Sequence, residues 1–148
     1  MTTLLGILNI TEDSFSDGGK FLDPELARVH ALALAKDADV IDLGAASSKP
    51  DAKPVAPDVE IARMAPIVEL LKRNGVSVSV DTFAPEVQHW ALAQNVAYLN
   101  DVRGFPDEAL YPALAASSAK LIAMFSVEGL GPATRLRVPA EELFGHIS

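Results

Sequence analysis

The sequence predicts an α/β fold that forms the N-terminal five β-α units of a (β/α)8, or TIM, barrel with parallel strands. Short apolar runs alternate with longer helical patterns along all 148 residues. Such repeats imply parallel strands joined by right-handed crossovers, in either an open doubly wound sheet or a barrel. Polar residues end nearly every predicted strand, which favours a barrel because active sites of that fold lie at the carboxyl ends of its strands. We expect a single domain over residues 1–148.

Five segments are predicted as strands because each is apolar along its length, as expected when both faces of a sheet are covered. They are residues 4–9, 40–43, 76–81, 97–101 and 120–124. The polar residues at their ends are Asn9, Asp42, Asp81, Asn100 and Asp101. In a barrel these side chains are expected to converge on one mouth.

The first helix is predicted to begin after Asp23, which can cap it, with Pro24 at the first helical position. Leu26, Val29 and Ala33 lie at helical spacing and form its expected apolar face.

Further helices follow the later strands, and their expected inward residues recur at helical spacing. The second runs from about Pro57 to Gly75, a natural left-handed cap, and its inward residues are Ile61, Met64, Val68 and Leu71. The third starts at Pro85, with Val87, Trp90 and Ala91 inward. The fourth carries Leu110, Leu114 and Ala115, and a fifth is expected to begin near Pro139.

Composition excludes several classes of function. The formal net charge of −8 argues against a nucleic-acid or anionic-membrane surface. The absence of cysteine excludes disulfides, thiolate metal sites and a cysteine nucleophile. Without a basic leader or a long apolar span, the sequence predicts a cytoplasmic protein that acts on small molecules. His30, His89 and His146 fall on predicted helices and are expected to be surface or packing residues.

The first β-α loop, residues 9–19, is long and rich in hydroxyls, carboxylates and glycines. A loop of this kind is either functional or a solvated surface segment. The strings GILNIT at residues 6–11 and DSFSDGG at residues 13–19 resemble the signature segment of dihydropteroate synthases. That resemblance favours the functional interpretation.

The second β-α loop, residues 42–52, resembles the second signature of the same family in an altered form. Its pattern GxASSxPD, together with Glu12 and the segment YLNDVRGFPD at residues 98–107, is similar to the plasmid-borne sulfonamide-resistance branch. The resemblance extends over nearly the whole chain. One departure is Phe125, which stands where the family usually has histidine.

The resemblance implies the condensation of 6-hydroxymethyl-7,8-dihydropterin diphosphate with p-aminobenzoate to give 7,8-dihydropteroate and diphosphate in folate biosynthesis, by a sulfonamide-insensitive variant. It implies Mg²⁺ as cofactor, with Asn9 as the protein oxygen near the metal, and a family-like homodimer. Asp81 is implied as the catalytic carboxylate. The residues implied to bind substrate are Asn100, Val102 and Met124 around the pterin, and Phe15, Ser48 and Pro50 around p-aminobenzoate.

Simpler structural roles remain open for several of these residues. Asp81 could cap the following helix, and Asn100 could be a turn amide satisfied by its own backbone. Val102 and Met124 could be core residues.

A complete barrel needs about 250 residues, so we expect the chain to be truncated after the fifth β-α unit, with exposed strand edges. By resemblance, the remaining pterin and diphosphate ligands come from later strands. The chain alone is therefore expected to be inactive and to need the missing C-terminal segment or a second chain. Two alternatives are the pterin-binding module of a methyltetrahydrofolate methyltransferase, a class that lacks the DSFSDGG loop, and an inactive truncated homologue.

Overall fold

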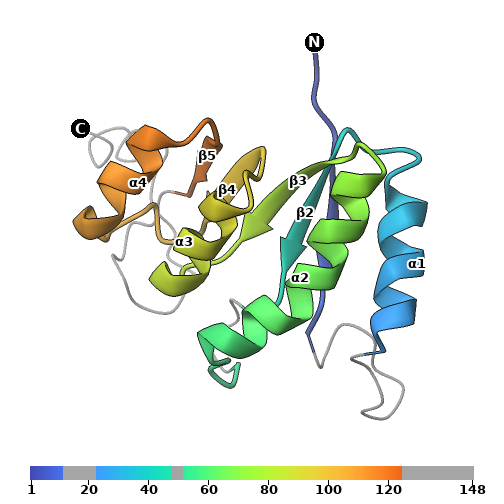
Figure 1. The fold of residues 1–148 in the computed structure, drawn as a ribbon, viewed down its shortest axis with the longest axis horizontal. Helices are drawn as coiled ribbons and strands as arrows, with labels where there is room; N and C mark the ends of the chain where they lie inside the picture. The colour runs from blue at the N-terminus through green and yellow to red at the C-terminus, as the bar shows by residue number, and fades with distance from the viewer. Residues whose placement is uncertain (12–22, 48–51, 125–148) are drawn as a thin grey trace, which may run out of the picture.

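A computed structural model describes residues 1–11, 23–47 and 52–124, where strands and helices alternate as predicted (Figure 1). The elements in order are β1 (Leu5–Asn9), α1 (Pro24–Leu34), β2 (Val40–Gly44), α2 (Pro57–Arg73), β3 (Ser77–Asp81), α3 (Pro85–Ala93), β4 (Tyr98–Asp101), the 3₁₀ helix η1 (Glu108–Leu110), α4 (Tyr111–Ala116) and β5 (Lys120–Ala123). All five predicted strands are confirmed. The helix expected near Pro139 lies outside the described residues.

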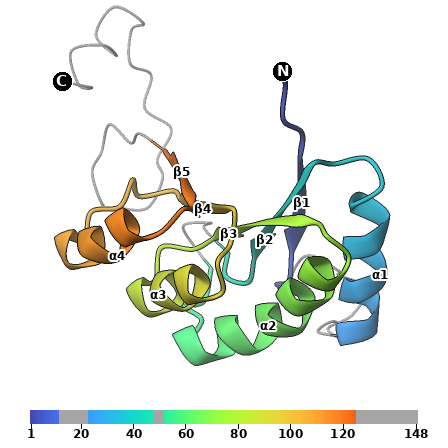
Figure 2. The same ribbon diagram turned by 45° about the horizontal axis from the view of Figure 1, so that its top comes forward.

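The five strands form one parallel sheet in the order β1-β2-β3-β4-β5. The helices α1 to α4 all lie on the same side of this sheet (Figure 2). A doubly wound sheet would reverse its strand order and carry helices on both faces. The sequential order with one-sided helices is instead the arrangement of consecutive units in a (β/α)8 barrel, which confirms the predicted fold class.

The two faces of the sheet differ sharply in chemistry because side chains alternate along each strand. The helix-facing residues are apolar and at most 3% exposed: Leu8, Ile41, Leu43, Val78, Val80 and Leu99. The opposite face carries Asp42, Ser79, Asp81 and Asn100. The core therefore lies between the sheet and the helices, and the polar groups line what would be the inside of a barrel.

Helix α2 packs as predicted. Met64, Val68 and Leu71 are buried, and Ile61 packs half-buried against the core. The helix ends at Arg73, and Gly75 adopts the left-handed backbone expected of a cap, with φ of 70°.

Helix α3 also packs as predicted, because Val87 and Ala91 are buried and Trp90 is half-buried. The fourth predicted helix is confirmed as η1 followed by α4. Leu110 is fully buried and Leu114 is half-buried, but Ala115 is exposed.

The predicted apolar face of α1 is wrong. Leu26 and Val29 are 42% and 62% exposed, and the residues that face the sheet are Ala27 and Ala31. The reason is close packing: a Cβ placed on Gly6 of β1 would lie only 3.0 Å from the Cβ of Ala38, just after this helix. Small side chains let α1 approach β1, so side-chain size rather than hydrophobicity decides which face turns inward.

Within the described ranges, no helix is long and apolar enough to cross a membrane. His30 and His89 lie at exposed positions on α1 and α3, as predicted, while His146 is outside these ranges.

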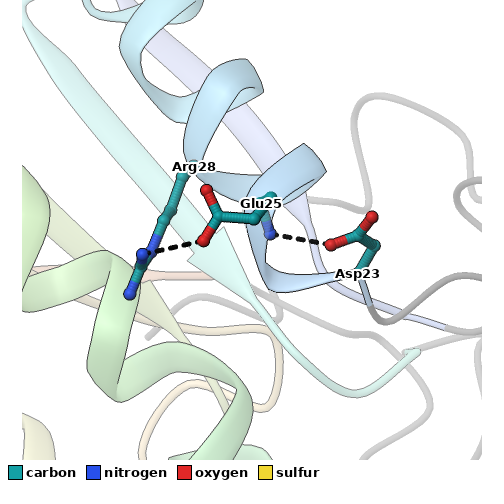
Figure 3. A network of polar contacts seen from close by, with 3 residues as sticks. All are labelled: Asp23, Glu25 and Arg28. Carbon is teal, nitrogen blue, oxygen red and sulfur yellow. Dashed lines mark hydrogen bonds and ion pairs between the residues drawn. The ribbon is translucent and has the colours of Figure 1, made fainter.

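Helix α1 begins at the predicted cap, as Figure 3 shows. The Asp23 carboxylate accepts a hydrogen bond from the backbone N–H of Glu25 at 2.9 Å. One turn further on, Arg28 Nη1 forms an ion pair with Glu25 Oε1 at 2.9 Å. The cap satisfies a backbone donor that has no partner within the helix, whereas the ion pair is largely exposed to water.

We predict that Asp23→Ala lowers the free energy of unfolding by about 1 kcal/mol, because it removes the cap. Asp23→Ser should retain most of the stability, since a hydroxyl can accept the same hydrogen bond. The control Arg28→Gln removes only the exposed ion pair and should cost less than about 0.5 kcal/mol. Urea denaturation measures all three variants, and an Arg28→Gln effect as large as that of Asp23→Ala would contradict the cap assignment.

Candidate ligand site at the carboxyl ends of the strands

The strand register brings the predicted polar residues together at one end of the sheet. Asn9, Gly44, Asp81, Asn100 and Ile122 are successive partners across β1 to β5 and share the face opposite the helices. The sequence prediction that strand-end polar groups converge is thus confirmed for Asn9, Asp81 and Asn100. Two residues earlier on β2 and β3, the same face carries Asp42 and Ser79.

The prediction is wrong for Asp101. This residue is one position past Asn100, so its side chain lies on the helix side, where its carboxylate accepts a hydrogen bond from Gln88 of α3 at 2.8 Å. It is 1% exposed and cannot take part in the polar face that Asn100 belongs to.

Asp42 and Asn100 are connected across the sheet by a direct hydrogen bond. Asn100 Nδ2 donates to Asp42 Oδ2 at 3.1 Å, although the two residues are 58 positions apart in the chain. The remaining side-chain oxygens of this pair, Asp42 Oδ1 and Asn100 Oδ1, are buried without a hydrogen-bond partner, and so is Ser79 Oγ on the strand between them. Buried polar atoms are normally paired, so this group of acceptors is suited to a ligand edge that presents N–H donors.

Asp42 was expected among the strand-end groups that converge, and the structure confirms this, but no ligand-binding role was predicted for it. The sequence could have indicated a place for Asp42 in the site, because this residue lies two positions before Gly44 and therefore on the same strand face. The prediction missed it because the bond to Asn100 depends on register across two strand pairs.

The electrostatics of the site centre on Asp81. Burial, together with the neighbouring carboxylates of Asp42, Asp101 and Glu60, raises the pKa of Asp81 to about 7 from its usual 3.8. Desolvation is the largest cause, and the like charges add to it. A carboxyl group with its pKa near neutrality, placed at strand ends, is a feature found at many functional sites.

Gly44 makes room for two of the candidate residues. A Cβ at this position would lie 3.1 Å from Asn9 Oδ1 and 3.8 Å from Asp81 Oδ2. Because β2 has no side chain here, Asn9 and Asp81 can lean toward each other from the strands on either side.

The two apolar candidates lie beside this polar row. Val102 follows β4 and is half-buried, whereas Met124 follows β5 and is 56% exposed. The alternative of a core role is therefore wrong for Met124. Phe15, Ser48 and Pro50, and also Phe125, lie outside the described residues.

A metal site made wholly from protein side chains is not found in the described part of the chain, where no group of three or more acidic or histidine side chains could hold an ion. Asn9 offers one amide oxygen in the space that Gly44 leaves open. One protein oxygen is compatible with Mg²⁺, which usually keeps several waters and binds substrate phosphates through few protein ligands.

Comparison with known proteins gives a consistent result. A family model described as pterin binding enzyme matches residues 5–142. The type-2 dihydropteroate synthase of Escherichia coli is 56% identical over 146 residues, which cover 98% of this chain and 54% of that protein.

Solved structures agree. A dihydropteroate synthase from Xanthomonas albilineans with 4-aminobenzoic acid has a TM-score of 0.70 at 36% identity, over 80% of this chain and 45% of that one. The Anaplasma phagocytophilum enzyme with bound 6-hydroxymethylpterin-monophosphate has a TM-score of 0.67 at 40% identity, over 80% of this chain and 47% of that one. The chain spans about half the length of these relatives.

We predict that Asp81→Asn raises the melting temperature at pH 8 and that this gain shrinks as the pH falls to 5. Between pH 4 and 7 the folded state holds a proton on Asp81 that the unfolded state has lost, so the contribution of Asp81 to stability falls as the pH rises. The uncharged amide avoids this cost. Thermal unfolding of Asp37→Asn, an exposed carboxylate, serves as control, and a gain for Asp81→Asn that did not change with pH would contradict the assignment.

Proposed function

We propose, because the chain belongs to the family of pterin-binding enzymes, that it supplies the pterin-binding part of a dihydropteroate synthase. The observation that carries the proposal is the row of acceptors from Asp42, Asp81 and Asn100 on the inner face of the sheet. An aminopyrimidinone ring presents N–H donors and a carbonyl along one edge, and these groups complement carboxylates and an amide. The relatives named above are dihydropteroate synthases, which disfavours a methyltransferase module.

The proposed reaction joins 6-hydroxymethyl-7,8-dihydropterin diphosphate to p-aminobenzoate in the cytoplasm. The arylamine nitrogen forms a bond to the exocyclic methylene carbon as the carbon–oxygen bond to diphosphate breaks, and the amine then loses a proton. Positive charge grows on the pterin while diphosphate departs. The ionised carboxylate of Asp81, fixed in a partly buried site, would stabilise that charge better than water does.

The remaining candidate residues have supporting roles in this proposal. Asn100 hydrogen-bonds the pterin edge, and Val102 and Met124 contact its apolar faces. Phe15, Ser48 and Pro50 form the p-aminobenzoate side, in loops that differ from the common family pattern and would make the enzyme insensitive to sulfonamides. This last step rests on sequence resemblance.

Mg²⁺ is the proposed cofactor, and Asn9 is the residue that would hold it. When bound, the ion would neutralise charge on the departing diphosphate. Asn9 itself would orient the diphosphate end of the substrate relative to Asp81, across the gap above Gly44.

The edges of the sheet indicate what completes the site. Among the residues that the structure describes, each outer strand has one neighbour in the sheet, and apolar residues at these edges are exposed: Leu4 and Ile7 at 55% and 66%, Leu121 at 47%. Exposed strand edges with apolar side chains favour association. We propose that three further β-α units cover them, from the same or a second polypeptide, and that the completed barrel forms a homodimer.

We predict that the 148-residue chain alone forms no measurable dihydropteroate, and that co-expression with the C-terminal half of the Escherichia coli type-2 enzyme restores product formation. The physical reason is that the three further strands would supply the rest of the barrel mouth. A coupled assay for diphosphate release measures both preparations. Substantial turnover by the purified chain would contradict the need for further units, and an assembled barrel without activity would contradict the proposed reaction.

We predict that 6-hydroxymethylpterin binds about tenfold more weakly at pH 6 than at pH 8, because its N–H donors bind the ionised form of Asp81, whose pKa is about 7. This ligand lacks phosphate, so no phosphate proton contributes. Calorimetry in buffers of different ionisation enthalpy should detect proton release on binding near pH 6.

Asp81→Asn provides the control for this titration. Its affinity should be lower at pH 8 and nearly constant with pH, whereas Ser77→Ala, at the opposite end of the same strand, should behave as the unaltered chain does. A pH dependence that survived in Asp81→Asn would assign the proton to another group.

A further inference from the structure

A chain of buried hydrogen bonds lies behind the candidate site, on the helix side of the sheet. It joins Glu60 of α2, Thr82 after β3, Gln88 of α3 and Asp101 of β4, none of which is more than 4% exposed. Thr82 Oγ1 donates to Glu60 Oε2 at 3.0 Å. Gln88 Nε2 donates to the Thr82 carbonyl at 3.1 Å and to Asp101 Oδ2 at 2.8 Å. The sequence predicts no role for Glu60, Thr82 or Gln88. Glu60 and Gln88 lie on helices, where polar residues usually face solvent.

Asp101 extends this chain of hydrogen bonds into the loop after β4. Its two carboxylate oxygens accept hydrogen bonds from the backbone N–H groups of Arg103 at 2.7 Å and Phe105 at 3.2 Å. Phe105 has φ of 58°, a conformation that a non-glycine residue holds only when its surroundings impose it. Asp101 therefore fixes the loop that contains Val102.

Two residues of this chain of hydrogen bonds directly follow, in sequence, the two residues that are proposed to bind the pterin. Thr82 comes after Asp81, and Asp101 comes after Asn100, so the alternation of the strands turns each pair to opposite faces of the sheet. Thr82 N also donates to the Asn100 carbonyl at 3.0 Å. A rotation of the backbone that displaced Thr82 or Asp101 would swing Asp81 or Asn100 away from its place.

Packing alone does not require these polar groups. Burying carboxyl groups costs solvation free energy, and apolar residues of similar volume often serve a core at least as well. Burial raises the pKa of Glu60, which shows that the environment disfavours its charge despite the hydrogen bond from Thr82. Departures of this kind from apolar packing are expected near functional sites.

We propose that Glu60, Thr82, Gln88 and Asp101 are positioning residues that fix the spacing and direction of Asp81 and Asn100 for a pterin ring. The choice of ligand rests on the proposed function, whereas the positioning itself concerns the geometry of the unliganded chain. Asn100 provides a direct reporter, because its side-chain amide donates to Asp42 on the far face of the sheet from the network.

The test compares Thr82→Val, which keeps the shape and loses the hydroxyl, with Thr82→Ser, which keeps the hydroxyl. In NMR spectra of the chain, Thr82→Val should shift or broaden the side-chain N–H signals of Asn100, and Thr82→Ser should restore them. Gln88→Leu, which removes the central donor, should have the same effect as Thr82→Val. The dissociation constant of 6-hydroxymethylpterin should rise about tenfold in Thr82→Val and stay within about twofold in Thr82→Ser.

Val68→Ala is the matched control, because it removes buried apolar volume from α2 and none of these hydrogen bonds. It should lower stability and leave the Asn100 signals in place at temperatures where the variant is folded. Unchanged Asn100 signals in Thr82→Val and Gln88→Leu, or an equal change in Val68→Ala, would overturn the positioning role. If the unaltered chain fails to bind the pterin, the proposed function fails, and the Asn100 signals still decide whether the network positions that residue.

Discussion

The constraint on which the rest of the structure depends is the in-register pairing of five parallel strands whose side chains alternate between two faces. Every strand contributes apolar residues to the helix side, and β1 to β4 each place a polar residue or a glycine on the other side near their carboxyl ends. A slip of one residue in any strand would exchange these faces. Fold and site are therefore fixed by the same register, since the pairing that buries Val80 and Leu99 also places Asp81 beside Asn100.

This arrangement concentrates negative charge at one end of the sheet. Asp42, Asp81, Asp101 and Glu60 come from different elements, and the pKa of Asp81 responds to the other three as well as to burial. Such a cluster opposes folding at neutral pH, because the unfolded chain can ionise the same groups in water. A ligand that offers N–H donors to these carboxylates would offset that cost. The site would therefore bind such a ligand in preference to one without N–H donors.

Much of the fold could be predicted from the sequence, because apolar runs and proline-initiated helices are local signals. The errors arose where a contact depends on geometry between elements. Helix α1 turns its alanines inward because β1 is close, and Asp101 faces the helices because register, not proximity in sequence, assigns its side. The contact between Asp42 and Asn100 spans 58 positions and has no local signature. The convergence of Asn9, Asp81 and Asn100 could be predicted because each lies at or next to the carboxyl end of an apolar strand.

The two faces of the sheet also differ in what completes them. The helix side is closed by segments adjacent in sequence, since α1, α2 and α3 each contact a strand that they connect, and such local contacts form with little loop-closure entropy. No helix of the described residues lies on the inner face, where Asp42 Oδ1, Ser79 Oγ and Asn100 Oδ1 are buried without hydrogen-bond partners. Groups opposite these strands in a barrel, or a ligand, must satisfy them. In the proposed complete barrel, folding of the described units and completion of the site would be separate steps, because the first uses contacts between neighbours in sequence and the second would use groups from the further units.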